Sequence, residues 1–431
     1  MMHDVNRRPA IRRAAIRRAA LLAAAVTWAL AVPPATALDT PVVLVHPGDD
    51  LAARVAASRR GEILRLAPGH YHLEPVDYTD PACGNCEDPA TPVPATLGMR
   101  LSGVRVRLVG AGADSTVIHT HAGYGVLVED CQGCRIDSLT VTDGARDPDG
   151  RATDAAIVVR RSSVTVLDCR IADNIGDPAV IDSVVVGVIG IAGREGAELT
   201  AGRNRIERNS WDGIALYRGA TAHIEANVID GVDAARGREA GGGRGVGIGV
   251  TWDAQATIRG NLVRNYWKGI GTFVDARTLI ASNVVEEILT WGISLWDAGK
   301  GRPSAVIENN VIDHTGACGV SIVRTLDGPP PPGRLTGNII MRTGQDPRYD
   351  DGEPYCMQTA IARHDVPESF EIAGNVLFRN REPGDQPGGE DVADETAFEV
   401  AAERLLERLV RRPTLLEARF FRSRRQEDGR R

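Results

Sequence analysis

The feature that most restricts what this chain can fold into is a phrase that recurs along it. The phrase is clearest at Gly269–Val285, which reads GIGTFVDARTLIASNVV, and close copies occupy Gly213–Ile229 and Gly247–Val263. Looser copies begin at Gly125, Ala156, Gly187, Gly292, Gly319 and Ala360. Such self-similarity indicates a repeat architecture, in which each unit buries its apolar face by stacking on its neighbours.

Within each copy, apolar residues alternate with polar ones, as in Ala222–Glu225. Alternation with a period of two places the Ile, Val and Leu side chains on one face of a short strand. No helical pattern of about 10–15 residues separates these segments, so the strands do not belong to βαβ units. We therefore expect an all-β chain of stacked coils, a parallel β-helix.

Seven of the nine copies also carry an asparagine two residues before an apolar residue. Asparagine tolerates the left-handed backbone conformation, and its amide bonds to nearby backbone, so it suits a tight turn between strands. Stacked about 4.8 Å apart, such amides would hydrogen-bond along a ladder inside the turn. The asparagines in this register are Asn204, Asn227, Asn261, Asn283, Asn310, Asn338 and Asn375, and Cys169 takes the corresponding place in an earlier coil.

These motifs resemble a known superfamily. The form G-[IV]-x-[LV]…I-x-x-N-x-[VI] is similar to the repeats of single-stranded right-handed parallel β-helix proteins of the pectate-lyase-like type. The segment Gly61–Tyr71, GEILRLAPGHY, resembles the entry into those helices. The resemblance covers roughly residues 40–380 and implies a right-handed solenoid.

The resemblance implies less about activity, because one fold hosts many functions. Members include polysaccharide lyases, hydrolases and epimerases, and β-helix proteins that help mature nitrous oxide reductase. The chain has no Asn-Thr-Asp followed by Gly-His-Gly, as in polygalacturonases. It also lacks the Asp-Pro-His-[Asp/Glu] of alginate epimerases, since Asp147-Pro148-Asp149 has no histidine.

The chain divides into four expected parts. Residues 1–37 form an export signal, 38–100 an N-terminal cap with entry strands, and 101–380 the β-helix. Residues 381–431 form a linker, a short helix and a basic tail, giving the fold its C-terminal helical tail. A helix over residues 49–60 is expected to cap the N-terminal coil, because terminal coils must protect their bare edges.

The export signal is read from three Arg-Arg pairs, an apolar run at Ala19–Val32 and the small residues of Ala35-Thr36-Ala37. The run is too short to span a bilayer, so we expect no transmembrane span in the mature chain. The mature protein is expected in the periplasm or outside the cell. The pattern favours Sec export, and Arg17-Arg18 leaves the twin-arginine route open.

Charge bears on the partners. Residues 38–431 hold 44 basic and 56 acidic side chains, a net charge of −12. A negative balance argues against nucleic acid as a partner. We expect a monomer.

The sharpest chemical constellation is a column of acids. Asp253, Asp275 and Asp297 lie 22 residues apart, one coil each, and are the predicted catalytic residues. Stacked carboxylates repel unless a cation binds or one stays protonated. Ca²⁺ is therefore a possible cofactor in β-elimination on a uronate polymer, and paired carboxylates would suit hydrolysis. The alternative is a solvated turn whose acids are neutralised by nearby Arg and Lys, namely Arg218, Lys268, Arg277 and Arg324.

Aromatic and basic residues accompany this column and are the predicted substrate-binding residues, because sugar rings lie on aromatic faces. They are Tyr217, Arg218, Trp252, Phe273, Trp296 and Arg324. A second aromatic set precedes the repeat glycine, and coil-to-coil packing is favoured for it over a ligand platform. Its members are Trp211, Tyr266, Trp267 and Trp291.

The cysteines and histidines offer two further readings. Cys83/Cys86 and Cys131/Cys134 have a zinc spacing, but behind an export signal disulfides are favoured, pinning the loop at 77–96 onto the first coils. A Cys318–Cys356 bridge is also possible. The pairs His70/His72 and His119/His121 could each chelate a metal, since residues i and i+2 of a strand share a face. The acidic insertion at 346–353 is read as a solvated loop rather than a calcium site.

Two functions remain open at this point. The first is an exported enzyme that binds or processes polysaccharide in a lateral groove. The second is a non-catalytic β-helix that scaffolds the cell envelope or binds a glycan or a partner protein there.

Overall fold

The structure, a computed structural model, describes residues 41–384 apart from 150, 152, 185, 233–244, 327–332, 350–356, 365–369 and 383. The export signal predicted over residues 1–37 lies outside this range. The predicted linker, helix and tail over residues 381–431 do as well, except for residues 381, 382 and 384.

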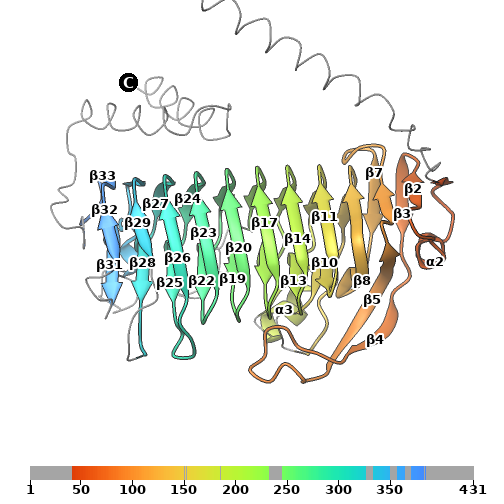
Figure 1. Ribbon diagram of the computed structural model, residues 1–431, viewed down its shortest axis with the longest axis horizontal. Coiled ribbons are helices and arrows are strands. Elements are labelled where there is room, and N and C mark those ends of the chain that lie inside the picture. Colours follow the sequence, from red (N-terminus) through yellow and green to blue (C-terminus); the bar gives the residue numbers. More distant parts are fainter. Residues whose placement is uncertain are drawn as a thin grey trace, which may run out of the picture. The chain divides into compact units, whose positions relative to one another are not determined.

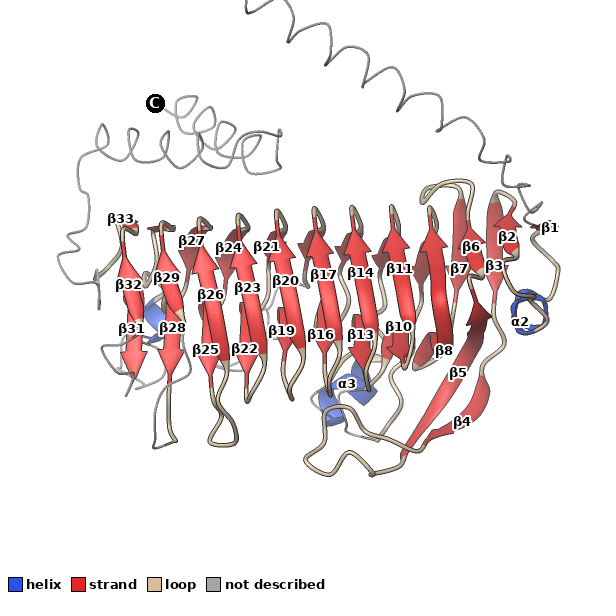
Figure 2. Cartoon of the chain, viewed as in Figure 1, coloured by secondary structure: helices blue, strands red, loops and turns tan. Residues whose placement is uncertain are grey.

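The described chain is an all-β right-handed β-helix, as predicted. Each coil contributes three short strands that stack on those of the next coil (Figures 1 and 2). Sheet 1 begins at the repeat Gly-Ile, sheet 2 follows it, and sheet 3 carries the strand after the ladder asparagine. Sheets 1 and 2 are continuous by hydrogen bonding, because the long strands β5 and β8 bend from one into the other.

The strands of sheet 1 are β5 (Val93–Val104) and β8 (Tyr124–Asp137) with their first halves, β10 (Ala155–Arg160), β13 (Ile189–Arg194), β16 (Ile214–Leu216), β19 (Val246–Val250), β22 (Lys268–Phe273), β25 (Trp291–Trp296), β28 (Val320–Val323) and β31 (Ile361–His364). Sheet 2 holds β1 (Val42–Val45), β2 (Ile63–Leu66), β6 (Arg107–Val109), β11 (Ser163–Leu167), β14 (Glu198–Gly202), β17 (Thr221–Glu225), β20 (Gln255–Arg259), β23 (Arg277–Ala281), β26 (Ser304–Glu308), β29 (Arg334–Thr336) and β32 (Glu371–Ala373). Sheet 3 holds β3 (Gly69–His72), β7 (Thr116–His119), β9 (Thr140–Thr142), β12 (Arg170–Ala172), β15 (Arg205–Glu207), β18 (Val228–Asp230), β21 (Leu262–Arg264), β24 (Val284–Ile288), β27 (Val311–Thr315), β30 (Ile339–Met341) and β33 (Val376–Phe378).

The core is built from inward rows of equivalent residues. Ile270 of β22 pairs in register with Ile293 of β25, and Ile280 of β23 pairs with Ile307 of β26. All four side chains have no solvent exposure. Parallel pairing therefore repeats one apolar contact at every coil, and each buried side chain contributes about 1.5–3 kcal/mol.

The predicted asparagine ladder is confirmed. Oδ1 of Asn283 accepts from both the backbone N–H and Nδ2 of Asn261, each at 3.0 Å. The same pair of bonds links successive asparagines from Asn204 to Asn375, and the backbone N–H of buried Cys169 donates to Asn204. The left-handed residue is the one before the asparagine, such as Ser282 (φ 59°), rather than the asparagine itself.

A short helix lies at the N-terminal end of the solenoid (Figure 2). It spans α2 (Leu51–Ala56), shorter than the 49–60 expected, and Asp50 caps it by accepting from the N–H of Ala53 at 2.9 Å. Leu51 and Val55 are buried in the core cluster. The described residues also form the helix α3 (Pro178–Val184) and the 3₁₀ turn η1 (Pro347–Tyr349).

Candidate functional site

The outer faces of the three sheets differ. Sheet 3 is crossed by ion pairs between neighbouring coils, such as Arg264 Nε to Asp230 Oδ2 at 2.7 Å and Arg342 Nε to Asp313 Oδ1 at 2.8 Å. Paired charges of this kind leave little free hydrogen-bonding capacity. Sheets 1 and 2 therefore hold the candidate surfaces for an extended ligand such as a polysaccharide.

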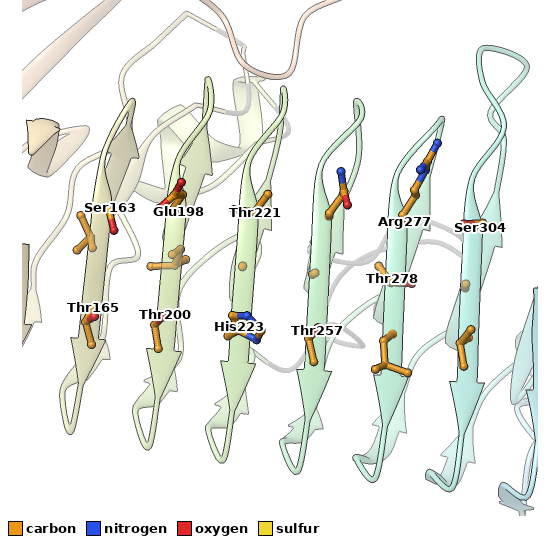
Figure 3. A pocket seen from close by; sticks show the side chains of 18 residues that line it. Ser163, Thr165, Glu198, Thr200, Thr221, His223, Thr257, Arg277, Thr278 and Ser304 are labelled. Carbon is orange, nitrogen blue, oxygen red and sulfur yellow. The ribbon is translucent and has the colours of Figure 1, made fainter. Parts of the chain in front are cut away.

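The outer face of sheet 2 is a shallow trough of about 570 Å³ across strands β11 to β26. Figure 3 shows two parallel rows on it, with Glu198 and Arg277 in one row and Thr200, His223 and Thr257 in the other. No Phe, Tyr or Trp is among the lining residues, and Glu198 is their one carboxylate. This face offers hydrogen bonds, but neither a ring platform nor paired acids.

The outer face of sheet 1 is covered at its N-terminal half by an antiparallel hairpin of β4 (Val76–Asp80) and β5. Asp80 at the end of β4 is fully buried and forms ion pairs with Arg160 and Arg194, which are themselves buried. Glu195 Oε2 also lies 3.2 Å from Nε of both arginines, so two carboxylates face two guanidiniums, and the buried charges are tolerated because they are paired. This ionic cluster clamps the hairpin onto the sheet.

The connection between β4 and β5, residues 81–92, extends from the hairpin as a strap (Figure 1). Arg218 donates from Nε to the carbonyl of Gly84 at 3.1 Å and from Nη2 to the carbonyl of Cys86. The Trp252 indole donates to Asn85 Oδ1 at 3.3 Å, and Lys300 forms an ion pair with Glu87. The strap is thus held by residues from three coils, those of β16, β19 and β25.

Three predicted substrate-binding residues lie under or beside this strap. Tyr217 is 4% exposed and belongs to the apolar cluster beneath the hairpin. The Arg218 guanidinium lies 4.0 Å from the centroid of the Trp252 ring, a cation–π contact. The strap therefore occupies the surface that the sequence suggested for sugar at these positions.

Both expected disulfides are present, Cys83–Cys86 and Cys131–Cys134. Each disulfide joins the two cysteines of one Cys-x-x-Cys motif. The expectation that the disulfides pin the 77–96 loop onto the first coils is therefore wrong. Arg218, Trp252, Lys300 and the Asp80 cluster hold the loop instead. Cys318 is buried, and Cys356 lies outside the described residues, so their predicted bridge stays a prediction.

Beyond the strap, the next coils build a cage around one cation. The Lys268 ammonium lies 4.2 Å from the ring centroids of both Trp267 and Trp291, 5.1 Å from that of Trp296 and 5.3 Å from that of Phe273. We call these five residues the lysine cage. Trp296 stands edge-on to Phe273 and to Trp291, with centroids 6.5 and 6.4 Å apart.

The base of the lysine cage includes a glycine, Gly271. The Phe273 ring folds over Gly271, where a Cβ would collide with it. Lys268 is 4% exposed, whereas Phe273 and Trp296 are partly exposed. The cage is therefore an aromatic wall that reaches solvent, with a cation at its base.

The cage also leaves polar atoms buried without hydrogen-bond partners. These are the indole nitrogens of Trp267, Trp291 and Trp296, together with Ser294 Oγ, none of which has a partner within the described part of the chain. Buried donors are almost always satisfied, and an unsatisfied one calls for an explanation such as a bound ligand or water. Three such indole donors around one ammonium fit a ligand rich in acceptor oxygens.

Asp212, on the outer face of sheet 1, is the carboxyl whose charge interacts with that of Lys268. It precedes β16, is 6% exposed, and accepts the Val246 N–H at Oδ1 over 2.6 Å. Burial raises the pKa of its carboxyl to about 7, against the lowering effects of the Val246 N–H and of the Lys268 charge. A carboxyl that titrates near neutral pH beside a lysine can both accept and donate a proton.

The predicted acid column has a different environment. Asp275 Oδ1 accepts the N–H of Asp253 at 2.6 Å, and Asp253 Oδ1 accepts the N–H of Gly219 at 2.7 Å. Asp297 accepts the N–H groups of Thr325 and Leu326 at 2.7 and 2.8 Å. Burial raises the pKa of Asp297, but these hydrogen bonds outweigh it and leave that pKa below its usual value. The carboxylates thus cap turns between coils, and their catalytic role stays a prediction.

Backbone N–H groups orient the carboxylates of Asp253 and Asp275. Cation binding and neutralisation by basic side chains stay predictions for this column. Across the described residues, no group of three or more His, Cys, Asp or Glu is placed to hold a metal. Arg324 Nε donates to the carbonyl of Leu326 at 2.8 Å.

The second aromatic set divides between packing and the cage. Tyr266 is buried in the core, and Trp211 packs on the cluster under the hairpin, as predicted for packing residues. Trp267 and Trp291 instead enclose Lys268. The sequence analysis named Lys268 only as a possible partner of the acid column and did not single out Asp212. Aligning the residue before each repeat Gly would have set Asp212, Val246, Lys268 and Trp291 in one row.

Comparisons with known proteins agree with this architecture. The right-handed β-helix region family model matches residues 102–243 and 187–345. The chain belongs to this family. No curated protein matches the sequence.

Two solved structures are similar in fold. The mannuronan C-5 epimerase AlgE4 A-module of Azotobacter vinelandii has a TM-score of 0.50 at 14% identity, covering 80% of this chain and 93% of that one. The Dettilon tailspike protein has a TM-score of 0.51 at 13% identity, covering 80% of this chain and 63% of that one. Among the described residues, no helix has the length and apolar character needed to cross a bilayer.

Proposed function

We propose that this chain is an exported protein that binds polysaccharide on the outer face of sheet 1, with the lysine cage as its central subsite. The observation that carries the proposal is the set of buried, unpartnered indole N–H groups around the Lys268 ammonium. A sugar supplies what this site lacks, because its hydroxyl or carboxylate oxygens accept hydrogen bonds and its apolar ring face lies on an aromatic side chain.

The aromatic wall and the base of the lysine cage would contact different parts of a sugar. Phe273 and Trp296, both predicted from the sequence as substrate-binding residues, have partly exposed rings at right angles to each other, so that either ring can lie against the apolar face of a sugar. Lys268 and the indole N–H groups meet its oxygens. A uronate carboxylate suits this base best, since a charged acceptor forms stronger hydrogen bonds than a neutral one.

A second candidate function, processing of the bound polymer, is favoured by Asp212. A carboxyl with a pKa of about 7 is suited to general acid–base catalysis at neutral pH. Asp212 is a single carboxylate coupled to a lysine, an arrangement that fits proton abstraction next to a uronate carboxylate, as in a lyase or epimerase. Hydrolysis would need a second acid flanking the bond.

Export rests on the signal pattern of residues 1–37 and on the two Cys-x-x-Cys disulfides, which form and persist in oxidising compartments. We place the mature chain in the periplasm or outside the cell. A non-catalytic envelope scaffold is the alternative.

The test is affinity gel electrophoresis of the mature chain through uronate and neutral polysaccharides, with parallel assays for unsaturated products and new reducing ends. We expect retardation by a uronate polymer and at least a tenfold weaker affinity in Trp296→Ala and Lys268→Gln. Thr200→Arg, on the trough of sheet 2, is the matched control and should bind as the wild type does.

The outcomes separate the two candidates. Turnover that is lost in Asp212→Asn while retardation remains would show catalysis at the cage. Retardation without any product would leave a binding protein. Equal retardation of the wild type and both cage variants, or no retardation on any polymer, would refute the proposed site.

A further inference from the structure

Four of the nine histidines gather at one place, far along the chain from the lysine cage. His70 and His72 lie on β3, His119 ends β7, and His121 follows it. β3 and β7 are paired strands of sheet 3, with His72 in register with His119. Because side chains alternate along a strand, His70 and His72 both point outward while Tyr71 between them is buried.

The His119 ring is the centre of this group. Its Nε2 lies 2.8 Å from Nδ1 of His70, and its Nδ1 lies 2.6 Å from Oδ2 of Asp143. The His72 ring stacks on it with centroids 4.3 Å apart and an interplanar angle of 10°. His119 is thus hydrogen-bonded at both nitrogens and restrained by a neighbouring ring, whereas His70, His72 and His121 are exposed.

These contacts define the protonation pattern. The Asp143 carboxylate accepts only, so Nδ1 of His119 carries a hydrogen. The 2.8 Å contact between His119 Nε2 and His70 Nδ1 then holds a hydrogen on one of these two nitrogens and a lone pair on the other. One proton therefore occupies the position between two imidazole nitrogens, both of which would be metal ligands without it.

We infer that His70 and His119 form a binding site for a divalent transition-metal ion of the kind that imidazole prefers, such as Cu²⁺ or Zn²⁺. The ion takes the place of the shared proton, which is released to solvent. His70 coordinates through Nδ1, His119 through Nε2, and water completes the coordination. Neither the metal nor any protein group changes oxidation state.

Asp143 is the positioning residue of this site. A metal-bound histidine commonly donates its other N–H to a carboxylate, which fixes its tautomer and orientation and raises its basicity as a ligand. The 2.6 Å contact between Asp143 and His119 already has this arrangement. Only two histidines meet at the shared proton, consistent with the absence of any preformed three-ligand group from the described residues. Imidazole ligands suit copper, zinc and nickel, and Cu²⁺ binds most tightly of these.

The experiment is a titration of the untagged mature chain with Cu²⁺, followed by calorimetry and by the electron paramagnetic resonance spectrum of the bound ion. We expect one ion per chain with nitrogen hyperfine coupling. Affinity should fall at least tenfold in His70→Ala and in His119→Ala, and about 10–100-fold in Asp143→Asn, the range seen when such an orienting partner is lost. His223→Ala removes an exposed histidine of sheet 2 and is the matched control.

Circular dichroism checks that each variant is folded, which is expected because these side chains point outward. Stoichiometric binding that persists in His119→Ala, or that His223→Ala weakens equally, would overturn the inference. So would the absence of nitrogen coupling in the wild type. None of these variants touches the lysine cage, so polysaccharide binding can fail or succeed independently.

Discussion

Removing one rung of the asparagine ladder should be among the most damaging small substitutions in this chain. We consider Asn283→Ala. The side chain has no solvent exposure. Its Oδ1 accepts the backbone N–H and Nδ2 of Asn261, and its Nδ2 donates to the carbonyl of Ile258 at 3.0 Å and to Oδ1 of Asn310 at 3.0 Å.

The magnitude follows from what remains after truncation. Asn261 Nδ2 keeps its bond to the carbonyl of Ile224, and Asn310 Oδ1 keeps the backbone N–H of residue 283. Inside the solenoid, the backbone N–H of Asn261 loses its acceptor, Asn283 Oδ1, and the carbonyl of Ile258 loses its donor, Asn283 Nδ2. At about 1–3 kcal/mol for each buried orphan, the loss is about 2–6 kcal/mol of unfolding free energy.

The assay is guanidinium unfolding followed by circular dichroism, comparing midpoints at constant slope. Gln255→Ala, an exposed substitution on sheet 2, is the control and should change the free energy by no more than about 0.5 kcal/mol. Asn283→Asp should be at least as damaging as Asn283→Ala, because a carboxylate cannot donate to Ile258 or Asn310. A loss below about 0.5 kcal/mol for Asn283→Ala would refute the structural importance of the ladder.

Three further predictions concern buried charges and the strap. Asp80→Ala removes one of the two carboxylates that Arg160 and Arg194 share and leaves only that of Glu195 for two buried guanidiniums, so we expect a loss of about 3–5 kcal/mol in denaturant unfolding, and an unchanged midpoint would argue against the clamp. Since the folded pKa of Asp212 is about 7 and its unfolded pKa about 4, wild-type stability should fall as pH rises through that window. Asp212→Asn should therefore be more stable than wild type at about pH 8 and lose that advantage near about pH 4, and a pH-independent difference in melting temperature would contradict this. Arg218→Ala removes the donor to two strap carbonyls, so cleavage at Glu87 by a glutamate-specific protease should accelerate several-fold, whereas an unchanged cleavage rate would show that the strap is held by other contacts.

The fold could be predicted because its signals are local and repeat at every coil. The apolar alternation, the Gly-Ile start and the ladder asparagine each recur in register, so one coil predicts the next. The turn conformation was assigned one residue too late, since the left-handed backbone falls on Ser282 and its equivalents. In the structure the asparagine supplies the amide, while its neighbour supplies the bend.

The site could be predicted only in part, because its residues occupy different positions within the repeat. Phe273 and Trp296 share one outward row with Tyr217 and were found by spacing. Lys268 and Trp291 occupy another row, and nothing in their local sequence shows that four rings converge on one ammonium. The strap is harder still to predict from the sequence, because Arg218 donates to a carbonyl 132 residues earlier in the chain. Coil spacing assigned Asp253, Asp275 and Asp297 to neighbouring coils but could not show that their carboxylates accept hydrogen bonds from backbone N–H groups.

The central claim, that polysaccharide binds at the lysine cage, can be tested through the indole N–H groups themselves. Trp28 lies in the predicted export signal, so the mature chain carries five tryptophans, each with one indole resonance in a ¹H–¹⁵N spectrum. Saturation with a uronate oligosaccharide should shift the resonances of Trp267, Trp291 and Trp296, whose N–H groups gain acceptors, and leave that of Trp252, already bonded to Asn85, unchanged. A shift confined to Trp252, or binding with no indole shift at all, would contradict the account.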